Sequence, residues 1–535
     1  MLTTILSALK HLARQLSWSR GPSGWLAVLV TGGLLYCLVF DANQLNRWLV
    51  PGILILTWCL LWYSFVSLFP TAVLSDTTDA SSKWGQRLTA KVRRAGYGVL
   101  ALGMTATAIA LVLMTSRLLN TWEYRSDLDL TQLHAPTTQH SALPNLSRAP
   151  NGRVILSWVE MPVEQVTPDV QKVAQLKFAE LTDDGWSDAT LVAQGSDWFL
   201  NWADFPSVIA LDDQQVAAHW LRRSAEKTYA YDVEISQSLD NGATWQKPYP
   251  PHRDGTASEH GFVSLYATTS GLGAIWLDGR NTIADAPNNA MTLRSTQLAR
   301  PVTSNISSDT SSLLDERVCD CCQTDVATVG DTVIAVYRDR DESEERDIAV
   351  QRMIDGQWLP SRLVARDGWR VTGCPVNGPA IASWSRATPN GTQTRVAVAW
   401  YTEAAGPQIR LAMSSNAAAS FDNAITIDDL QPIGRVDLAV DDDGSALVSW
   451  IRTTSESENS AQLVVRRIFP GGSMEPIRVV AQISAARSSG FPQMIRDRDT
   501  LVFAWTSTKT EKAVGGRIQA RTTGILTASV PLSAI

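Results

Sequence analysis

Short apolar runs that each end in an aromatic residue recur along the chain from about residue 150 onward. The copies read VILSW, VAAHW, LGAIW, VIAVY, VAVAW, ALVSW and LVFAW, and they end at Trp158, Trp220, Trp276, Tyr337, Trp400, Trp450 and Trp505. Successive aromatic residues lie 50 to 63 positions apart. Each run is short for a globular helix and rich in Val, Ile, Leu and Trp, which favours a buried strand. A repeat of this length indicates a fold built from one supersecondary unit that buries its apolar face against its neighbours.

Further strands are predicted on both sides of these runs. Turn residues such as Asp212-Asp213 and Gly330-Asp331 suit a tight hairpin to a preceding strand. Downstream stretches such as Asp347–Met353 supply a third strand, and a fourth often follows a turn containing Gly and Trp. Four strands per unit, with no helical period between them, predict an all-β propeller of seven four-stranded blades, with six blades as the alternative. The propeller is expected to occupy residues 141–535.

One predicted turn has a more explicit sequence. Ser238-Leu-Asp240-Asn-Gly242-Ala-Thr244-Trp245 has the form S-x-D-x-G-x-T-W, and Ser414-Ser-Asn416-Ala-Ala418-Ala-Ser420-Phe421 is a degenerate copy. In such a turn an Asp side chain caps the backbone and Gly supplies a special backbone angle. The motif resembles the Asp-box of the sialidase (BNR-repeat) propellers. These turns lie at the blade periphery in that family, so the resemblance implies the fold more strongly than an activity.

Three long apolar runs precede the propeller, at residues 25–40, 48–69 and 97–115. The second is long enough to span a bilayer as a helix, the third is just long enough, and the first is at the short end. No cleavage site of small residues follows the first run, which argues against a cleaved signal peptide. We therefore expect three transmembrane helices. The predicted domains are a cytoplasmic segment (1–23), a membrane domain (24–116), a polar stalk (117–140) and the propeller.

Basic residues are distributed unevenly around these runs. Three precede the first run and five lie between the second and third, whereas Arg47 is the one basic residue between the first two. Because positive residues stay in the cytoplasm, we expect a cytoplasmic N-terminus, an inner-membrane location and a periplasmic propeller. The centres of the runs hold no charged or His residue, which favours anchoring over transport. Three spans are more than an anchor needs, so a membrane protein partner is a further expectation.

The charge balance excludes one class of partner. The net charge is −7 and the pI is about 5.5. The propeller sequence contains no block of Lys and Arg, so we expect no nucleic-acid binding.

In a propeller, the segments that enter each first strand and those that leave each second strand emerge on the same face, around the central channel. The entering segments carry Asp204, Glu259, His260, Cys319, Cys321, Cys322, Cys374, Asn377, Arg435, Asp437 and Arg487. The leaving segments carry Arg222, Arg223, Asp278, Arg280, Arg338, Tyr401, Glu403 and Arg452. Guanidinium groups bind carboxylates in bidentate pairs, so this face predicts a glycan or another anionic small molecule as ligand.

The resemblance to sialidases implies roles for some of these residues. Enzymes of that family bind the substrate carboxylate with three arginines, and use a Tyr–Glu pair as nucleophile and an Asp as acid/base. By position, the triad would be Arg280, Arg338 and Arg435. Tyr401 with Glu403 would be the nucleophile pair, and Asp204 or Asp278 the acid/base, with His260 and Asn377 as further ligand contacts. The resemblance thus implies an exo-α-sialidase-like glycoside hydrolase, if the chain is an enzyme.

The chain also departs from that family. The family's Arg-Ile-Pro signature is absent, since Leu143-Pro144-Asn145 opens the first blade. The alternative for the charged residues is that they pair with one another in a structural network.

Four cysteines also fall on the predicted face. Cys319, Cys321 and Cys322 precede blade four, and Cys374 precedes blade five. An even count in an oxidising compartment favours two disulfides, and the pairing Cys319–Cys322 with Cys321–Cys374 avoids a bridge between adjacent residues. The alternatives are a thiolate site for Cu or Zn, with His260 as a nearby imidazole, and a redox-active pair.

Three function hypotheses follow. The first is binding, and also hydrolysis, of an acidic glycan at the arginine-rich face. The second is a metal-handling module attached to a membrane partner, and the third is a scaffold for protein interactions.

Overall fold

The computed structural model describes residues 128–149, 151–161, 173–269, 271–283, 289–299, 309, 311–389, 391–454, 459–512 and 518–535. The predicted cytoplasmic segment and the three predicted membrane spans lie outside these residues. Among the helices of the described part of the chain, none has the length and apolar character that crossing a membrane requires.

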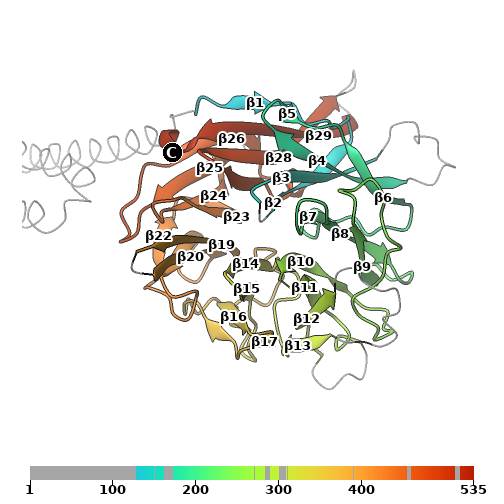
Figure 1. The fold of residues 1–535 in the computed structure, drawn as a ribbon, viewed down its shortest axis with the longest axis horizontal. Helices are drawn as coiled ribbons and strands as arrows, with labels where there is room; N and C mark the ends of the chain where they lie inside the picture. The colour runs from blue at the N-terminus through green and yellow to red at the C-terminus, as the bar shows by residue number, and fades with distance from the viewer. Residues whose placement is uncertain are drawn as a thin grey trace, which may run out of the picture. The chain divides into compact units, whose positions relative to one another are not determined.

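The described strands form seven antiparallel sheets that stand around a common centre as the blades of a propeller (Figure 1). Blade one contains β2 (Ser141–Arg148), β3 (Val154–Glu160), β4 (Ala174–Thr182), β5 (Gly185–Trp186) and β6 (Thr190–Gly195). Blade two contains β7 (Ser207–Ala210), β8 (Val216–Arg223) and β9 (Tyr231–Ser238). Blade three contains β10 (His260–Thr268), β11 (Gly271–Asp278), β12 (Thr292–Ala299) and β13 (Ser312–Asp315). Blade four contains β14 (Asp325–Val329), β15 (Thr332–Arg338), β16 (Ile348–Ile354), β17 (Gln357–Trp358) and β18 (Arg362–Leu363).

The remaining three blades complete the ring. Blade five contains β19 (Ala380–Thr388), β20 (Gly391–Thr402), β21 (Gln408–Ser414) and β22 (Ile425–Asp428). Blade six contains β23 (Pro432–Val440), β24 (Ala446–Thr453), β25 (Ser460–Ile468) and β26 (Arg478–Ser484). Blade seven contains β27 (Gln493–Asp497), β28 (Thr500–Lys512), β29 (Ile518–Pro531) and β1 (Thr131–Leu133). Two short 3₁₀ helices are η3 (Arg487–Ser489) and η4 (Leu532–Ala534). The seven sheets agree with the predicted count of seven blades, but among the described residues blade two has three strands and blades one and four have five, in place of the four expected.

The outermost strand of blade seven comes from the other end of the chain. β1 pairs antiparallel with β29, with Gln132 opposite Ala528. Leu128 and Leu130 pack against the apolar core of the same blade. The propeller therefore begins before the predicted boundary at residue 141, inside the segment predicted as a stalk. A three-residue strand with two polar positions has no alternation long enough to predict it.

The aromatic residues of the repeated runs lie on the second strand of each blade and are all buried. Several of them donate a hydrogen bond to a carboxylate near the rim of the blade, because a buried indole or phenol needs a polar partner. These bonds are Trp158 to Glu160 (2.8 Å), Trp276 to Asp278 (2.8 Å), Tyr337 to Asp315 (2.6 Å), Trp400 to Asp367 (2.6 Å) and Trp450 to Asp428 (2.7 Å). In four cases a basic side chain pairs with the same carboxylate: Lys177 with Glu160, Arg280 with Asp278, Arg410 with Asp367, and Arg452 with Asp428. This aromatic–carboxylate–cation arrangement is therefore a repeated element of the fold.

A ring of polar side chains joins each blade to the next near the axis. In each of the following hydrogen bonds the donor is named first: Ser147 to Val208 O (2.7 Å), Phe262 N to Asp204 (2.8 Å), Thr324 to Phe262 O (2.8 Å), Ile381 N to Asp325 (2.8 Å), Arg435 N to Asn377 (2.8 Å), Met494 N to Asp437 (2.6 Å) and Asn145 to Gln493 (3.2 Å). Inside this ring lies a cavity of about 500 Å³, lined by the innermost strands of all seven blades. The cavity is the central channel of the propeller.

Both predicted Asp-box turns adopt the same hydrogen-bonded conformation. Asp240 accepts bonds from Thr244 N (2.8 Å) and Ser238 Oγ (2.7 Å). In the degenerate copy, Asn416 accepts the equivalent bonds from Ser420 N (3.0 Å) and Ser414 Oγ (2.8 Å). The amide oxygen of Asn thus replaces the carboxylate of Asp as the cap of the turn.

Candidate functional site

Segments that precede different blades meet at one mouth of the central channel. Gln323, which precedes blade four, donates to the carbonyl of Ala203 (2.7 Å) and accepts from Gly378 N (3.0 Å). Trp202, which precedes blade two, stacks on Phe491, which precedes blade seven, with ring centroids 5.8 Å apart. These contacts place the segments before blades two, four, five and seven side by side, in agreement with the face predicted from the sequence.

Three oxygen-bearing side chains form a chain of hydrogen bonds at this mouth. The hydroxyl group of Tyr231 donates to Glu259 (2.6 Å) and lies 3.2 Å from Oδ2 of Asp204. Burial raises the pKa of Asp204 to about 8, although the bond from Phe262 N opposes this rise. Burial also raises the pKa of Glu259 to about 7, against the effect of the Tyr231 bond, which favours the ionised form. Tyr231 and Asp204 are buried, whereas Glu259 is partly exposed.

Arg338 and Arg435, two members of the predicted arginine triad, are buried and bonded to the protein itself. Arg338 donates to the carbonyls of Arg346 (2.7 Å), Asn377 (2.9 Å) and Tyr401 (2.7 Å). The carbonyls that accept from Arg435 belong to the loop containing η3: Ala485 (3.3 Å), Ala486 (3.2 Å) and Gly490 (3.1 Å). Burial lowers the pKa of Arg338 to about 9 and that of Arg435 to about 10. Their guanidinium groups fix loops at the channel mouth.

Asn377 lies between these two arginines. Its carbonyl accepts from Arg338, and its side chain accepts from the Arg435 backbone N–H and donates to the carbonyl of Ile433 (3.3 Å). The structure therefore places Asn377 as a link between blades five and six. A role of Asn377 in ligand contact remains a prediction.

Tyr401 and Glu403, predicted as a nucleophile pair, are in direct contact. The Tyr401 hydroxyl donates to the Glu403 carboxylate, which is exposed. Burial raises the pKa of Tyr401, and the bond to Glu403 raises it further. The Tyr401 ring packs edge-on against Trp369, with centroids 5.7 Å apart. The pair exists as predicted, and its role in catalysis remains a prediction.

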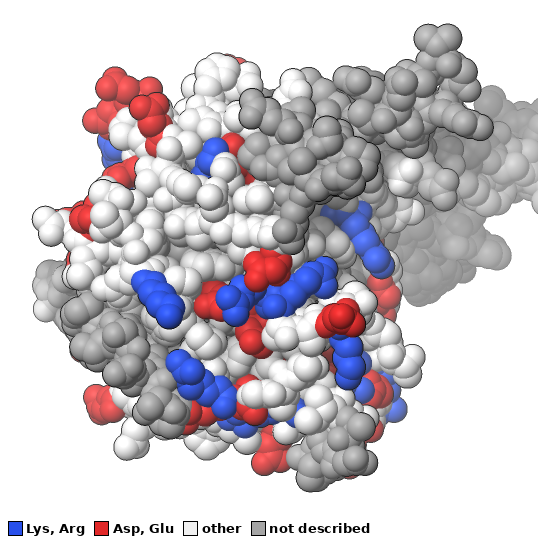
Figure 2. Space-filling model, turned by 90° about the vertical axis from the view of Figure 1, so that its right-hand side faces the viewer, with Lys and Arg blue, Asp and Glu red and all other residues white. Residues whose placement is uncertain are grey.

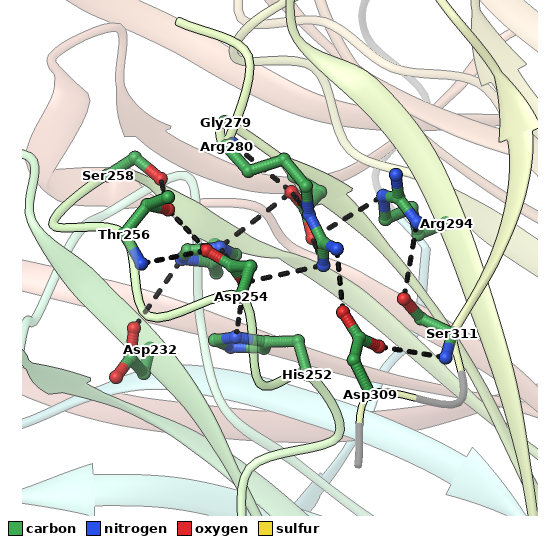
Figure 3. Close-up of polar contacts among 12 residues, drawn as sticks. Asp232, His252, Asp254, Thr256, Ser258, Gly279, Arg280, Arg294, Asp309 and Ser311 are labelled. Carbon is green, nitrogen blue, oxygen red and sulfur yellow. Dashed lines mark hydrogen bonds and ion pairs between the residues drawn. The ribbon is translucent and has the colours of Figure 1, made fainter. Parts of the chain in front are cut away.

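Arg280 belongs to a partly buried charged cluster between blades two and three (Figure 3), and it pairs there with the buried Asp278. Arg280 pairs with Asp278 (2.7 Å), Asp309 (2.6 Å) and Asp254 (3.3 Å). Although burial alone would raise the pKa of Asp278, the bond from Arg280 lowers it. Asp278 also accepts from Trp276, so its place follows from the arrangement that other blades repeat. Both residues are thus fully engaged within the protein.

His260 completes this cluster together with His252, which the sequence did not single out. The two imidazole rings stack with centroids 3.9 Å apart. His260 is fully buried, and its nitrogens face the carbonyl of Tyr231 (3.2 Å) and Asp254 (3.1 Å). Burial opposes protonation of His260, but bonds to Asp232 and Asp254 outweigh this effect and raise its pKa to about 10. His260 is therefore a buried cation.

The donor atoms of this cluster have a spacing that a metal ion could use. Ligand atoms of Asp232, His252 and His260, and of Asp254, His260 and Asp278, lie within 4.8 Å of one another. However, Arg280 already contacts two of these carboxylates, and His260 carries a second positive charge. These two cations offset two of the three carboxylates in these groups, so the cluster fits a structural network better than a metal centre.

The four cysteines form the two disulfides that the sequence favoured. Cys319 is bonded to Cys322 and Cys321 to Cys374, with Cα atoms 5.8 and 6.1 Å apart, within the usual range for a disulfide. The alternative of a Cu or Zn site needs thiolates, and sulfur atoms bonded to each other are not thiolates. The second disulfide links the segment before blade four to the segment before blade five.

Several residues of the mouth were not selected as site residues from the sequence. Tyr231 and Glu259 are 28 positions apart, so only the fold reveals their contact. Arg487 is exposed, and its guanidinium group lies 5.8 Å from the ring centroid of Trp202. Arg487 was recognised as lying on this face, but no spacing in the sequence distinguished it from the buried arginines.

The surface charges are mixed. On the side of the molecule drawn in Figure 2, the acidic and basic side chains of the described residues lie next to one another in small groups separated by uncharged surface.

Comparisons with known proteins add little to this description. No protein-family model matches the sequence, and no curated protein matches it. Among solved structures, similar chains include a protein of unknown function from Dyadobacter fermentans (14% identity, 75% of this chain and 98% of that chain, TM-score 0.38). Others are the phage phi92 endosialidase (11%, 76% and 69%, 0.42) and the α-L-arabinofuranosidase Arb93A from Fusarium graminearum (12%, 77% and 99%, 0.37). At such low identities and TM-scores, the propeller architecture rests on the seven sheets themselves.

Proposed function

We propose that this chain binds an acidic glycan at the mouth of its channel and hydrolyses it, as a sialidase-like glycoside hydrolase held at a membrane. The observation that carries the proposal is the hydrogen-bonded group of Glu259, Tyr231 and Asp204. Glu259 is partly exposed and its pKa is raised to about 7, so both of its protonation states are populated near neutral pH. A carboxyl group of this kind suits proton transfer to and from a bound glycan.

Arg487 is the residue that we assign to the anionic group of the ligand. It is exposed at the mouth, whereas Arg280, Arg338 and Arg435 donate to acceptors within the protein. The guanidinium group of Arg487 lies over the ring of Trp202, which is two residues before Asp204 in the sequence.

Binding can be tested with the full-length chain and a panel of acidic oligosaccharides. Each is compared by calorimetry with the same oligosaccharide after its carboxyl groups are reduced to alcohols. The proposal expects the acidic form to bind more tightly, and Arg487→Gln to remove this difference. Equal affinities for both forms would contradict it.

Hydrolysis can be tested by chromatography of the products. Glu259→Gln keeps the shape of the side chain but cannot transfer a proton, so it should abolish turnover and leave binding intact. Glu403→Gln is the matched control for the second Tyr–Glu pair. If Glu403→Gln abolishes turnover and Glu259→Gln does not, the nucleophile pair predicted from the sequence is the reactive one.

Attachment to the inner membrane is part of the proposal, with the propeller in the periplasm. It is supported by the three apolar runs and by the distribution of basic residues around them. Protease treatment of spheroplasts should remove the propeller and spare the loop between the second and third runs. Resistance of the propeller in intact spheroplasts, with cleavage only after lysis, would place it on the cytoplasmic side.

A further inference from the structure

We propose that the four cysteines at the channel mouth act as a thiol–disulfide relay. An external dithiol delivers two electrons to the protein by attacking Cys374, and the relay passes these electrons to the buried Cys319–Cys322 bond. This activity is independent of glycan binding, and its test uses no glycan.

The two disulfides differ in their access to solvent. Cys374 is exposed and Cys321 is partly exposed, whereas Cys319 and Cys322 are each 1% exposed. Exposed disulfides are the labile ones, because an attacking thiolate can reach them. A reductant of the size of a small dithiol or a dithiol protein can therefore reach the Cys321–Cys374 bond directly, but not the buried bond.

Cys321 connects the two bonds. Its Sγ atom lies within 4.8 Å of the Sγ atoms of both Cys319 and Cys322. Once Cys321 is released as a thiolate, it faces a disulfide that solvent cannot reach.

Arg346 supplies a fixed positive charge beside the buried bond. It is 1% exposed, and its Nη1 atom donates to Cys319 Sγ at 3.4 Å. Its guanidinium group also pairs with Glu344 (2.9 Å) and with Asp320 (4.0 Å). A neighbouring guanidinium group stabilises a thiolate, so Cys319 is a favourable leaving group in exchange.

The exchange balances in two stages. In the first stage, a thiolate of the dithiol attacks Cys374 Sγ, and Cys321 leaves as a thiolate. The second thiol of the dithiol then displaces Cys374 from the mixed disulfide. The dithiol is thereby oxidised, and the protein gains two electrons and two protons. Next, the Cys321 thiolate attacks Cys319 Sγ and Cys322 leaves. Finally, the Cys374 thiolate attacks Cys321 Sγ and Cys319 leaves beside Arg346. The exposed bond is thereby remade and the buried pair holds the electrons.

The decisive experiment uses the Cys374→Ser variant of the full-length chain without any reductant. In this variant Cys321 is left as a thiol beside the buried bond. Free thiols are trapped with N-ethylmaleimide in acid-quenched samples, the remaining disulfides are reduced and labelled with a second reagent, and fragment-ion mass spectrometry assigns each label. The relay predicts that the first label is shared between Cys321 and Cys322. A label that stays on Cys321 alone would overturn the proposal.

The Cys321→Ser variant is the matched control, because it loses the same disulfide but keeps its thiol at Cys374. Its first label should lie on Cys374 alone. With dithiothreitol as the probe, the buried pair should become reduced in the wild-type chain and stay oxidised in Cys321→Ser under the same conditions. Equal reduction in both would show that the buried bond reacts without the relay. Arg346→Met should slow reduction of the buried pair, and Arg346→Lys should restore it.

Discussion

Tyr231 donates a 2.6 Å hydrogen bond to Glu259, which lies in the long connection between blades two and three. A phenol at this distance stabilises the ionised form of the carboxyl group, against a burial that favours the neutral form. The pKa of Glu259 thus reflects burial, which raises it, opposed chiefly by this hydroxyl group.

Replacing Tyr231 by Phe should raise the pKa of Glu259 above its value of about 7, because the bond that favours the ionised form is lost. The midpoint of the pH profile of glycan turnover should shift upward. Tyr401→Phe is the control, since that hydroxyl donates to Glu403 instead. An equal shift in both variants would mean that Glu259 is not the group whose titration sets the pH profile.

The free energy of unfolding should fall as the pH rises from about 4 to 8. Burial raises the pKa of Asp204 to about 8 and those of Asp325 and Asp437 to about 7, above the ordinary value of 3.8. The folded state therefore binds more protons than the unfolded state in this window, and stability is lost as these carboxyl groups ionise. Urea unfolding at a series of pH values measures this slope, and Asp325→Asn should make it shallower. A stability that increases over the same window would contradict the assignment.

Arg338 and Arg487 should behave in opposite ways when replaced. Arg338→Met leaves three carbonyl groups without their donor and should lower the free energy of unfolding by roughly 3 kcal/mol or more. Arg487→Gln should change the stability by less than about 0.5 kcal/mol, because the side chain is exposed. Its effect should appear in glycan affinity instead. Denaturant unfolding measures the stability of both variants, and calorimetry measures their glycan affinity. A loss of stability in Arg487→Gln would contradict the assignment of Arg487 as an exposed ligand-binding residue.

Two glycine variants should separate backbone strain from steric clash. Gly330 has φ +57° with no atom within 4 Å of an added Cβ, so Gly330→Ala should cost about 1 kcal/mol. Gly242, in the Asp-box turn, has φ +87°, and an added Cβ would lie 2.6 Å from Cζ of Phe178 in blade one. Gly242→Ala should therefore cost roughly 2–4 kcal/mol. Equal costs in unfolding experiments would mean that the Phe178 ring moves aside freely.

The architecture could be predicted because its signals are local. Each aromatic run carries its own strand pattern, and the repetition of the run gives the number of blades. The disulfide pairing was also accessible, since three neighbouring cysteines leave few unstrained pairings with Cys374. In contrast, β1 is recognisable only from its pairing with β29 almost 400 residues away.

The roles of the polar residues were harder to predict because partners are distant in sequence. The pair of Tyr401 and Glu403 could be predicted because the two residues are two positions apart at the end of the same strand. The contact of Tyr231 with Glu259 required the fold. For the arginines, the sequence shows the positive charge but not whether backbone carbonyls already accept hydrogen bonds from the guanidinium group. The carbonyls that accept from Arg338 belong to residues 346, 377 and 401.

The pairing of β1 with β29 has a consequence for how the protein is made. A ribosome synthesises β1 among the first residues of the propeller and β29 among the last, so β1 has no partner in the ring during most of translation. The nascent propeller therefore stays open until nearly all of its residues have emerged, and until then the faces of blades one and six that pack against blade seven are uncovered. Products that terminate before β29 would leave β1 and the outer edge of β28 unpaired, and chaperones and proteases could recognise them as unfinished.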